Sequence, residues 1–292
     1  MKMEGFLMGI IIAIISALFM TAMQILLKKS YKELNPSVAF FFDAIFGLLI
    51  WIPIGFIFGG KLNEIPQCLI YAVISAILSE ALVFYALSKG DLSVATVLIS
   101  TYPIYTLLFS YIINNEILTP LQILFILITI IGTILTCIEK DFKLKNIKKF
   151  TTLIPIITAI AIGISDTLTK KVINQTSSFS FLIAIAIVQL PVALIYLKIS
   201  KQSFRKIRDE IKSDIKEYKY SVYGSLFNIL GTGCLLISFN YAMASIASPL
   251  TAIYTPIVLI YSLIFLKERI NKVNLLGTIS AFIGAFGIIL IG

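Results

Sequence analysis

The sequence contains no histidine, and only 13% of its 292 residues are charged. The missing histidine excludes Ser-His-Asp and Cys-His nucleophiles and every histidine-ligated metal site. The three cysteines, Cys68, Cys137 and Cys234, are scattered through apolar runs without a CxxC pair, which predicts packing residues rather than a disulfide framework. No Walker motif is present, which excludes direct use of ATP. We therefore expect no enzyme, no metal and no cofactor.

Apolar residues are correspondingly abundant. They make up 59% of the chain and give a mean hydropathy of +0.99, whereas an average soluble domain is roughly 45–50% apolar. A membrane-spanning helix needs about 20 apolar residues, so ten of them would use about 200 residues and leave short loops. This balance excludes a soluble enzyme. It also excludes a nucleic-acid binder despite the net charge of +9, because in a membrane protein such charge marks cytoplasmic loops and contact with anionic headgroups.

Long apolar runs recur along the whole chain. They are too long for barrel strands, and backbone groups in lipid must be paired internally, so an all-α membrane protein is predicted. The first run is too long for a signal peptide and is expected to remain as a span. The ten predicted spans cover residues 6–27, 36–58, 66–88, 91–114, 119–138, 151–173, 178–199, 220–243, 246–266 and 272–291.

Positive charge is distributed unevenly between the connections. Of the 24 Lys and Arg residues, 20 belong to odd-numbered connections, and four belong to the N-terminus and the even-numbered connections. The positive-inside rule then predicts cytoplasmic odd connections, including loops 139–150 and 200–219, and places both termini outside a cell (inner) membrane.

The connection 200–219 also carries a helical pattern. Its apolar residues are spaced by three and four, with Lys, Arg, Asp and Glu between them. This spacing predicts an amphipathic helix at the membrane interface, and a charged loop is the alternative. The apolar face would consist of Phe204, Ile207, Ile211, Ile215 and Tyr218.

The two halves of the chain resemble each other. Residues 85–104 read YALSKGDLSVATVLISTYPI and align, with one three-residue gap, to residues 241–257, which read YAMASIASPLTAIYTPI. About a dozen residues later a glutamate follows in each half, Glu116 and Glu268. A glycine also matches in the last helix of each half, at positions 132 and 284.

We therefore predict two five-helix repeats, residues 1–138 and 151–292, joined by the basic loop 139–150. An odd number of spans makes the second copy enter the membrane from the opposite side, so the repeats would be inverted. Two such bundles can open a site in the middle of the membrane first to one side and then to the other. Inverted repeats are much commoner in transporters and channels than in membrane enzymes.

Together these motifs resemble the EamA type of the drug/metabolite transporter superfamily. The features in common are the ten spans in two halves, Tyr-Ala-[Leu/Met] at the end of the third helix, a proline in the fourth and a glutamate just after it. The resemblance covers essentially the whole chain. It implies a basket of helices around a central cavity built mainly by helices 1, 3, 4, 6, 8 and 9, with the last helix of each half at the outer edge. It also implies transport of amino acids, nucleobases, sugars, sugar phosphates or drugs, usually outward in bacteria.

Three acidic residues lie inside predicted spans: Asp43, Glu80 and Asp166. A carboxylate in hydrocarbon costs about 2.5–3.5 kcal/mol on insertion scales, so such residues usually face a cavity or a partner. Glu80 is the preferred candidate for substrate binding and proton coupling; a protonated glutamate bonded to a neighbouring helix is the alternative. Asp166 is expected either to pair with Lys170 one turn on or to line the cavity. Asp43 is not expected to have a functional role, because the resemblance makes helix 2 peripheral.

Polar and aromatic residues cluster in helices 4, 8 and 9 and could bind a zwitterion or a heterocycle. Hydrogen bonding between helices is the alternative role for such residues. Pro103 and Pro256 are predicted hinges, because proline frees a backbone carbonyl and kinks a helix. Besides Glu80 and Asp166, the candidate substrate-binding residues are Gln24, Tyr102, Tyr105, Asn228, Thr232, Tyr254 and Thr255.

These features predict a secondary transporter, and specifically an exporter, of a small polar metabolite such as an amino acid. It would work by alternating access in the lipid bilayer, with protons as candidate coupling ions, as a monomer or weak homodimer. Efflux of lipophilic cations is an alternative, although helices 1 and 6 carry Gln24 and Asp166 where small multidrug relatives use a glutamate in their first helix. A lipid scramblase or an intramembrane enzyme remains a further alternative, although the run 163–166 lacks the second glycine of an aspartyl-protease motif.

Overall fold

The computed structural model describes residues 3–30, 35–87, 92–138, 153–213, 215–265 and 271–291. These ranges contain ten helical segments long and apolar enough to cross a membrane, and no strand. The predicted all-α membrane architecture is confirmed. The ten spans, numbered in chain order, are Glu4–Leu26, Pro36–Ile57, Leu62–Ala86, Ala95–Asn114, Pro120–Cys137, Leu153–Ile173, Ser178–Ile199, Tyr218–Ser238, Ala244–Phe265 and Lys272–Ile291.

Seven spans are single helices and three are interrupted. The single helices are α1 (Met3–Ser30), α2 (Pro36–Ile57), α7 (Pro120–Cys137), α8 (Leu153–Ile173), α9 (Ser178–Ile199), α11 (Ile215–Ser238) and α14 (Lys272–Ile291). Span 3 runs through the 3-10 turn η1 (Leu62–Glu64), α3 (Ile65–Ser75), the π-helical turn η2 (Ala76–Ala81) and α4 (Leu82–Leu87). Span 4 consists of α5 (Leu92–Ile99) and α6 (Tyr102–Asn114), and span 9 of α12 (Ala244–Ala252) and α13 (Tyr254–Phe265).

Local sequence explains where several helices begin. The Asn35 side chain accepts the backbone N–H of Ser37 at 3.0 Å and so caps α2. Thr119 and Gln122 form a reciprocal capping box at the start of α7. A proline follows each of these two caps, where its missing N–H costs no helical hydrogen bond.

The outer surface of the bundle is apolar. Large side chains such as Leu49 and Phe286 are 65% and 62% exposed, as expected of groups that face lipid chains. Hydroxyl groups such as those of Ser16 and Thr106 are buried between helices, where they hydrogen-bond to backbone carbonyls. The chain is therefore a multi-pass membrane protein with its polar groups inside.

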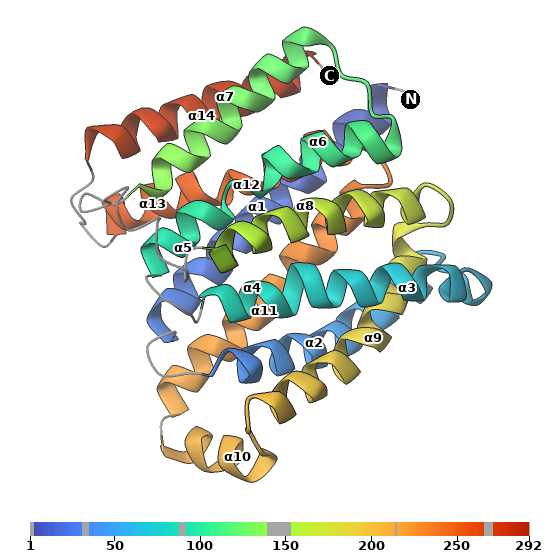
Figure 1. Cartoon of the computed structure of the whole chain (residues 1–292), viewed down its shortest axis with the longest axis vertical. Helices are drawn as coiled ribbons and strands as arrows, with labels where there is room; N and C mark the ends of the chain where they lie inside the picture. Colours follow the sequence, from blue (N-terminus) through green and yellow to red (C-terminus); the bar gives the residue numbers. More distant parts are fainter. Residues whose placement is uncertain are drawn as a thin grey trace.

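The contacts between helices relate the two halves of the chain to each other. Span 1 packs on span 8 and span 3 on span 6; span 4 packs on span 6 and span 9 on span 1. Spans 2 and 7 pair with each other, and so do spans 5 and 10, as α7 and α14 at one edge of the molecule (Figure 1). Exchanging each span with the span five positions later therefore turns this set of contacts into itself: 1–8 becomes 6–3, 4–6 becomes 9–1, and the pairs 2–7 and 5–10 are unchanged. The expected position of the last helix of each half, at the outer edge, is confirmed.

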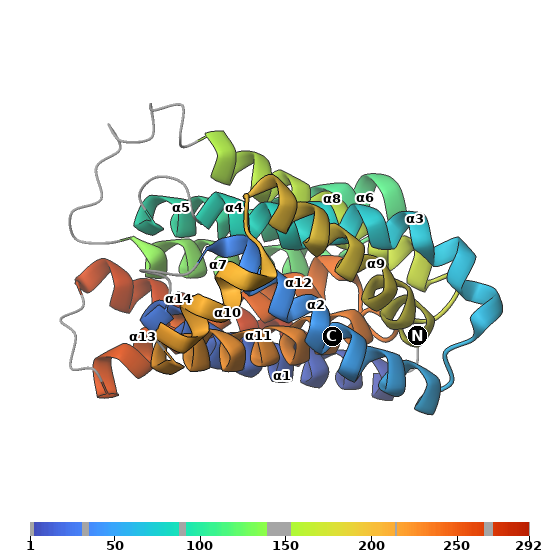
Figure 2. The ribbon, with the colours of Figure 1, turned by 90° about the horizontal axis from the view of Figure 1, so that it is seen from below.

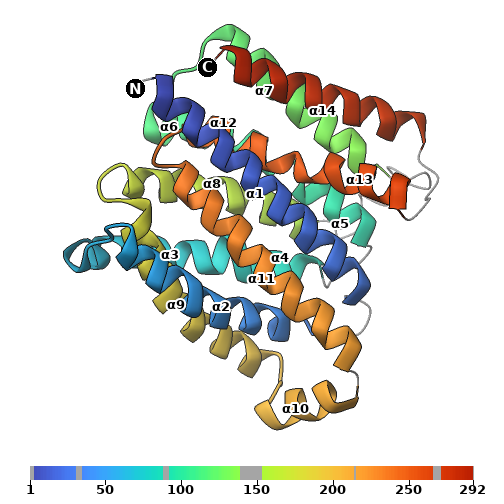
Figure 3. The same cartoon turned by 180° about the vertical axis from the view of Figure 1, so that it is seen from behind.

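Ten crossings, an even number, should bring the two ends of the chain to the same end of the bundle. Figure 2 shows the helices lying side by side along a common direction, and Figure 3 shows the two ends of the chain close together. The first helix of each half, α1 and α8, runs in opposite directions across the bundle (Figure 1). The loop 139–150, which the sequence predicts as the connection between repeats, lies outside the described residues.

The predicted amphipathic helix exists but is shorter than expected. It is α10 (Phe204–Ser213), and Ile207 is buried with Val38, Leu197 and Tyr218. Tyr218 itself belongs to α11, so the prediction of one helix carrying all five apolar residues is wrong. The apolar face of α10 packs against α2 and the end of span 7 through Ile207 and Phe204.

Candidate transport site

A cavity of about 150 Å³ lies in the middle of the bundle. Its lining comes from spans 1, 3, 4, 6, 8 and 9, the six helices that the family resemblance implies. Both halves therefore contribute to it. Its polar lining consists of Gln24, Ser75, Ser79, Glu80, Tyr102, Asp166, Thr169, Asn228, Thr232, Thr251 and Tyr254.

The two interrupted helices of spans 4 and 9 bring tyrosines to this cavity. Pro103 is the second residue of α6 and Pro256 is the third residue of α13, so each helix break directly precedes a predicted hinge proline. Tyr102 and Tyr254 are the first residues of the helices after the breaks, and both line the cavity. The predicted interruptions are present, and the use of the prolines as hinges stays a prediction.

Asp166 is held by hydroxyl groups. Its Oδ2 accepts the hydroxyl of Ser248 at 2.7 Å and lies 3.5 Å from that of Thr106. Lys170 instead donates to the backbone carbonyl of Phe239, at 2.5 Å, near the end of α11. The expected Asp166–Lys170 ion pair is therefore wrong, because the lysine reaches the free carbonyl that follows a neighbouring helix.

Two further carboxyls, those of Glu80 and Asp43, are buried inside the bundle. Glu80, in η2, is only 7% exposed and lines the cavity. The amide of Asn228 donates to Oδ2 of Asp43 at 2.7 Å, and the Asp43 side chain is fully buried. Asp43 does not line the cavity, as expected of a residue on helix 2, but its side chain is buried and points inward from α2 to α11. A carboxyl within an apolar span was the only sequence signal for it.

Seven of the nine predicted binding residues line the cavity: Gln24, Glu80, Tyr102, Asp166, Asn228, Thr232 and Tyr254. Tyr105 instead packs against α8, where a Cβ on Gly163 would lie 2.5 Å from the Tyr105 Cβ. Thr255 follows Tyr254 and therefore points about 100° away around the helix. Sequence reasoning missed small hydroxyl residues, Ser75, Ser79 and Thr169, because such residues are routine at all helix contacts.

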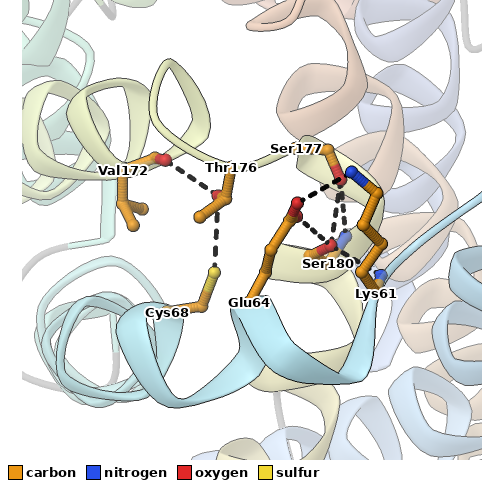
Figure 4. Close-up of polar contacts among 7 residues, drawn as sticks. All are labelled: Lys61, Glu64, Cys68, Val172, Thr176, Ser177 and Ser180. Atoms are coloured by element: carbon orange, nitrogen blue, oxygen red, sulfur yellow. Dashed lines mark hydrogen bonds and ion pairs between the residues drawn. The ribbon is translucent and has the colours of Figure 1, made fainter.

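A belt of polar contacts joins spans at the end of the bundle that carries the chain termini. We use the term polar belt for Lys61, Glu64, Glu116, Lys170, Ser178, Ser180, Asn240 and Ser245. In Figure 4 the Ser180 hydroxyl lies between Glu64 and Ser177; it donates to Glu64 at 2.7 Å and accepts the Lys61 backbone N–H at 2.9 Å. The belt connects the first half of the chain to the second.

A larger hollow, of about 800 Å³, lies between the start of α2, α4 and the end of α9. Several of its lining side chains are among the exposed apolar residues, such as Ile195 and Ile199. It is a groove in the outer apolar surface, so the smaller polar cavity is the better candidate site. Within the described part of the chain, no group of three or more Cys, Asp and Glu side chains could hold a metal ion.

Comparison with known proteins gives three findings. The EamA-like transporter family matches residues 7–138 and 150–290. An "Uncharacterized transporter" of Archaeoglobus fulgidus is 28% identical over 256 residues, which are 84% of each chain. A protein of known crystal structure matches with a TM-score of 0.76 over 97% of each chain, and at 13% identity this likeness concerns the fold alone.

Proposed function

Because the chain belongs to the EamA-like transporter family, we propose that it is a secondary transporter that exports a small polar metabolite, such as an amino acid, through the central cavity. The observation that carries the proposal is the position of the cavity. It lies where spans from both halves meet, and it is lined by carboxyl, amide and hydroxyl groups inside an otherwise apolar bundle.

The size of the cavity supports a small solute. Sites for drug-sized ligands typically enclose about 300–1,000 Å³, whereas this cavity encloses about 150 Å³. A compact amine or zwitterion would find carboxyl partners in Glu80 and Asp166. The size argues against lipophilic-cation efflux, which needs room for bulky aromatic groups.

The packing supports alternating access by two inverted halves. Exchange of span n with span n + 5 relates the main helix contacts, and α1 and α8 run in opposite directions. Both halves also interrupt their fourth helix just before a proline, at Pro103 and Pro256. Two such halves can rock against each other around a fixed central site. The polar belt would then close the end that carries the termini in the state described here.

Transport is tested with the purified full-length protein in liposomes, offered a panel of labelled amino acids, purines, sugars and tetraphenylphosphonium. We expect saturable flux of one polar class, driven by a pH gradient. Glu80→Gln should abolish the gradient-driven flux at normal expression, because the amide cannot exchange a proton. Asp209→Asn, an exposed change on α10, is the matched control. Flux of tetraphenylphosphonium alone would favour cation efflux, and lipid movement without solute flux would favour a scramblase.

A further inference from the structure

Asp43 lies directly behind the wall of the cavity. Its side chain is fully buried on α2, and Oδ2 accepts the Asn228 amide at 2.7 Å. Its second oxygen, Oδ1, is buried without a hydrogen-bond partner. Among the residues whose side chains are described, no Lys or Arg forms an ion pair with Asp43. An ionised carboxylate so placed would be costly, so the site needs a proton or a compensating contact.

Glu80 approaches the same asparagine from the cavity side. Glu80 and Asn228 line the same cavity, and the charges of Glu80, Asp43 and Asp166 lie close enough to interact. Of the elements packed on this part of α2, η2 carries Glu80 and α11 carries Asn228, whereas Tyr85 of α4 and Tyr196 of α9 line the outer groove. Of the Lys and Arg side chains that the structure describes, none forms an ion pair with either carboxyl.

The backbone conformation at Glu80 independently indicates a functional site. Residues Ala76–Ala81 form a π-helical turn, which inserts an extra residue into the helix, and such turns occur frequently at functional sites. The turn changes the direction of every side chain after it and so contributes to aiming Glu80 at the cavity. Ser79, within the same turn, has a buried hydroxyl without a hydrogen-bond partner.

The chemistry of an amide favours one proton on this pair. Asn228 offers a donor, Nδ2, and an acceptor, Oδ1. The donor suits an ionised carboxylate, as at Asp43, and the acceptor suits the O–H of a protonated carboxyl. An asparagine bonded to one carboxyl and lining a cavity with the other can therefore stabilise the state in which Asp43 is ionised and Glu80 is protonated.

We propose that Asp43 and Glu80, together with Asn228, form a coupled pair that holds one proton. Glu80 takes the proton from water in the cavity or returns it there; the proton does not pass through the amide. Asp43 acts through Asn228 as a positioning residue and transmits the charge of the pair to the contact between α2 and α11. The two helices belong to opposite halves and are already tied by the Trp51 indole to the Ile229 carbonyl at 3.0 Å. The inference rests on the proposed function only in assigning the proton to transport.

Infrared difference spectroscopy of the full-length protein in lipid tests the pair without any solute. The C=O stretch of protonated carboxyls is followed against pH in the wild type, Asp43→Asn, Glu80→Gln and Asn228→Leu, with Glu64→Gln as control. We expect two coupled steps in the wild type, separated by more than about one pH unit. Each single carboxyl variant should leave one step, and Asn228→Leu should shift both carboxyl bands. Glu64→Gln should leave the two steps and both bands unchanged.

The reciprocal variants keep the test decisive if one of them fails to fold. If Asp43→Asn removes one step and leaves the remaining titration where it was, the two carboxyls are independent and the proposal is overturned. The proposal is likewise overturned if Glu80→Gln leaves the titration of Asp43 where it was. Coupled titration without solute flux would contradict only the proposed function, and flux with independent titration would contradict only the coupled pair.

Discussion

The carboxylate of Glu116 accepts both the backbone N–H of Ser245, at 3.0 Å, and its hydroxyl, at 2.5 Å. It also accepts the N–H of Ala244 at 3.0 Å, so it occupies the start of α12 from outside that helix. Negative charge is favourable at a helix N-terminus, where backbone N–H groups lack helical partners. Glu116 therefore joins the end of span 4 to the start of span 9 across the two halves.

Glu116→Ala should destabilise the protein. The change leaves two buried N–H groups and a hydroxyl without their charged acceptor, at a cost of about 2–3 kcal/mol. Denaturant unfolding in detergent measures the effect. Asp209→Ala is the control, because its ion pair with Arg208 is exposed and worth less than about 1 kcal/mol. Equal stability of the two variants would show that the Glu116 contacts contribute nothing.

Lys170 and Asp166 should behave as energetically independent residues. Each has its own partner, the Phe239 carbonyl for the lysine and the Ser248 hydroxyl for the aspartate. In a double-mutant cycle with Lys170→Met and Asp166→Asn, we expect a coupling free energy below about 0.5 kcal/mol, although each single change is destabilising. A coupling free energy above about 1 kcal/mol would instead show that Asp166 and Lys170 interact, as the sequence suggests.

Gly132→Ala should weaken the contact between α7 and α14. A Cβ at this position would lie 2.3 Å from the Ala281 backbone nitrogen, and backbone cannot move aside as a flexible side chain can. Overpacking of this kind costs about 1–3 kcal/mol. Gly5→Ala on α1 is the matched control, because a Cβ there meets nothing within 4 Å. Thermal unfolding of the two variants compares them, and an equal midpoint would contradict the close packing.

The periodic and compositional features of the fold could be predicted from the sequence. Apolar runs of about 20 residues have a single stable solution in lipid, so the spans agree with the structure to within a few residues at most ends. The recurring Tyr-Pro-Ile and Thr-Pro-Ile motifs predicted kinks at Pro103 and Pro256, and each of these two prolines lies in the first turn of a helix that follows a break. The matched glycines in the last helix of each half are likewise found where α7 and α14 pack closely.

Side-chain direction could not be predicted in the same way. Asp43 was judged by the position of its helix, whereas its burial depends on which side of α2 meets α11. Lys170 was judged by its spacing from Asp166 on one helix, whereas the nearest acceptor belongs to another helix. Both contacts join residues far apart in the chain, about which helical periodicity says nothing.

Opposite ends of the bundle should be reachable from opposite sides of the membrane. Arg205 on α10 and Asn174 between α8 and α9 are both exposed and lie at the ends of different connections. With the three native cysteines replaced by alanine, a membrane-impermeant maleimide applied to intact cells should label Asn174→Cys and spare Arg205→Cys until the membrane is opened. The physical reason is the excess of Lys and Arg in the odd-numbered connections, which hold 20 of the 24 and which the positive-inside rule therefore predicts to be cytoplasmic. The reverse labelling pattern would invert the predicted orientation, and the polar belt would then face the cytoplasm.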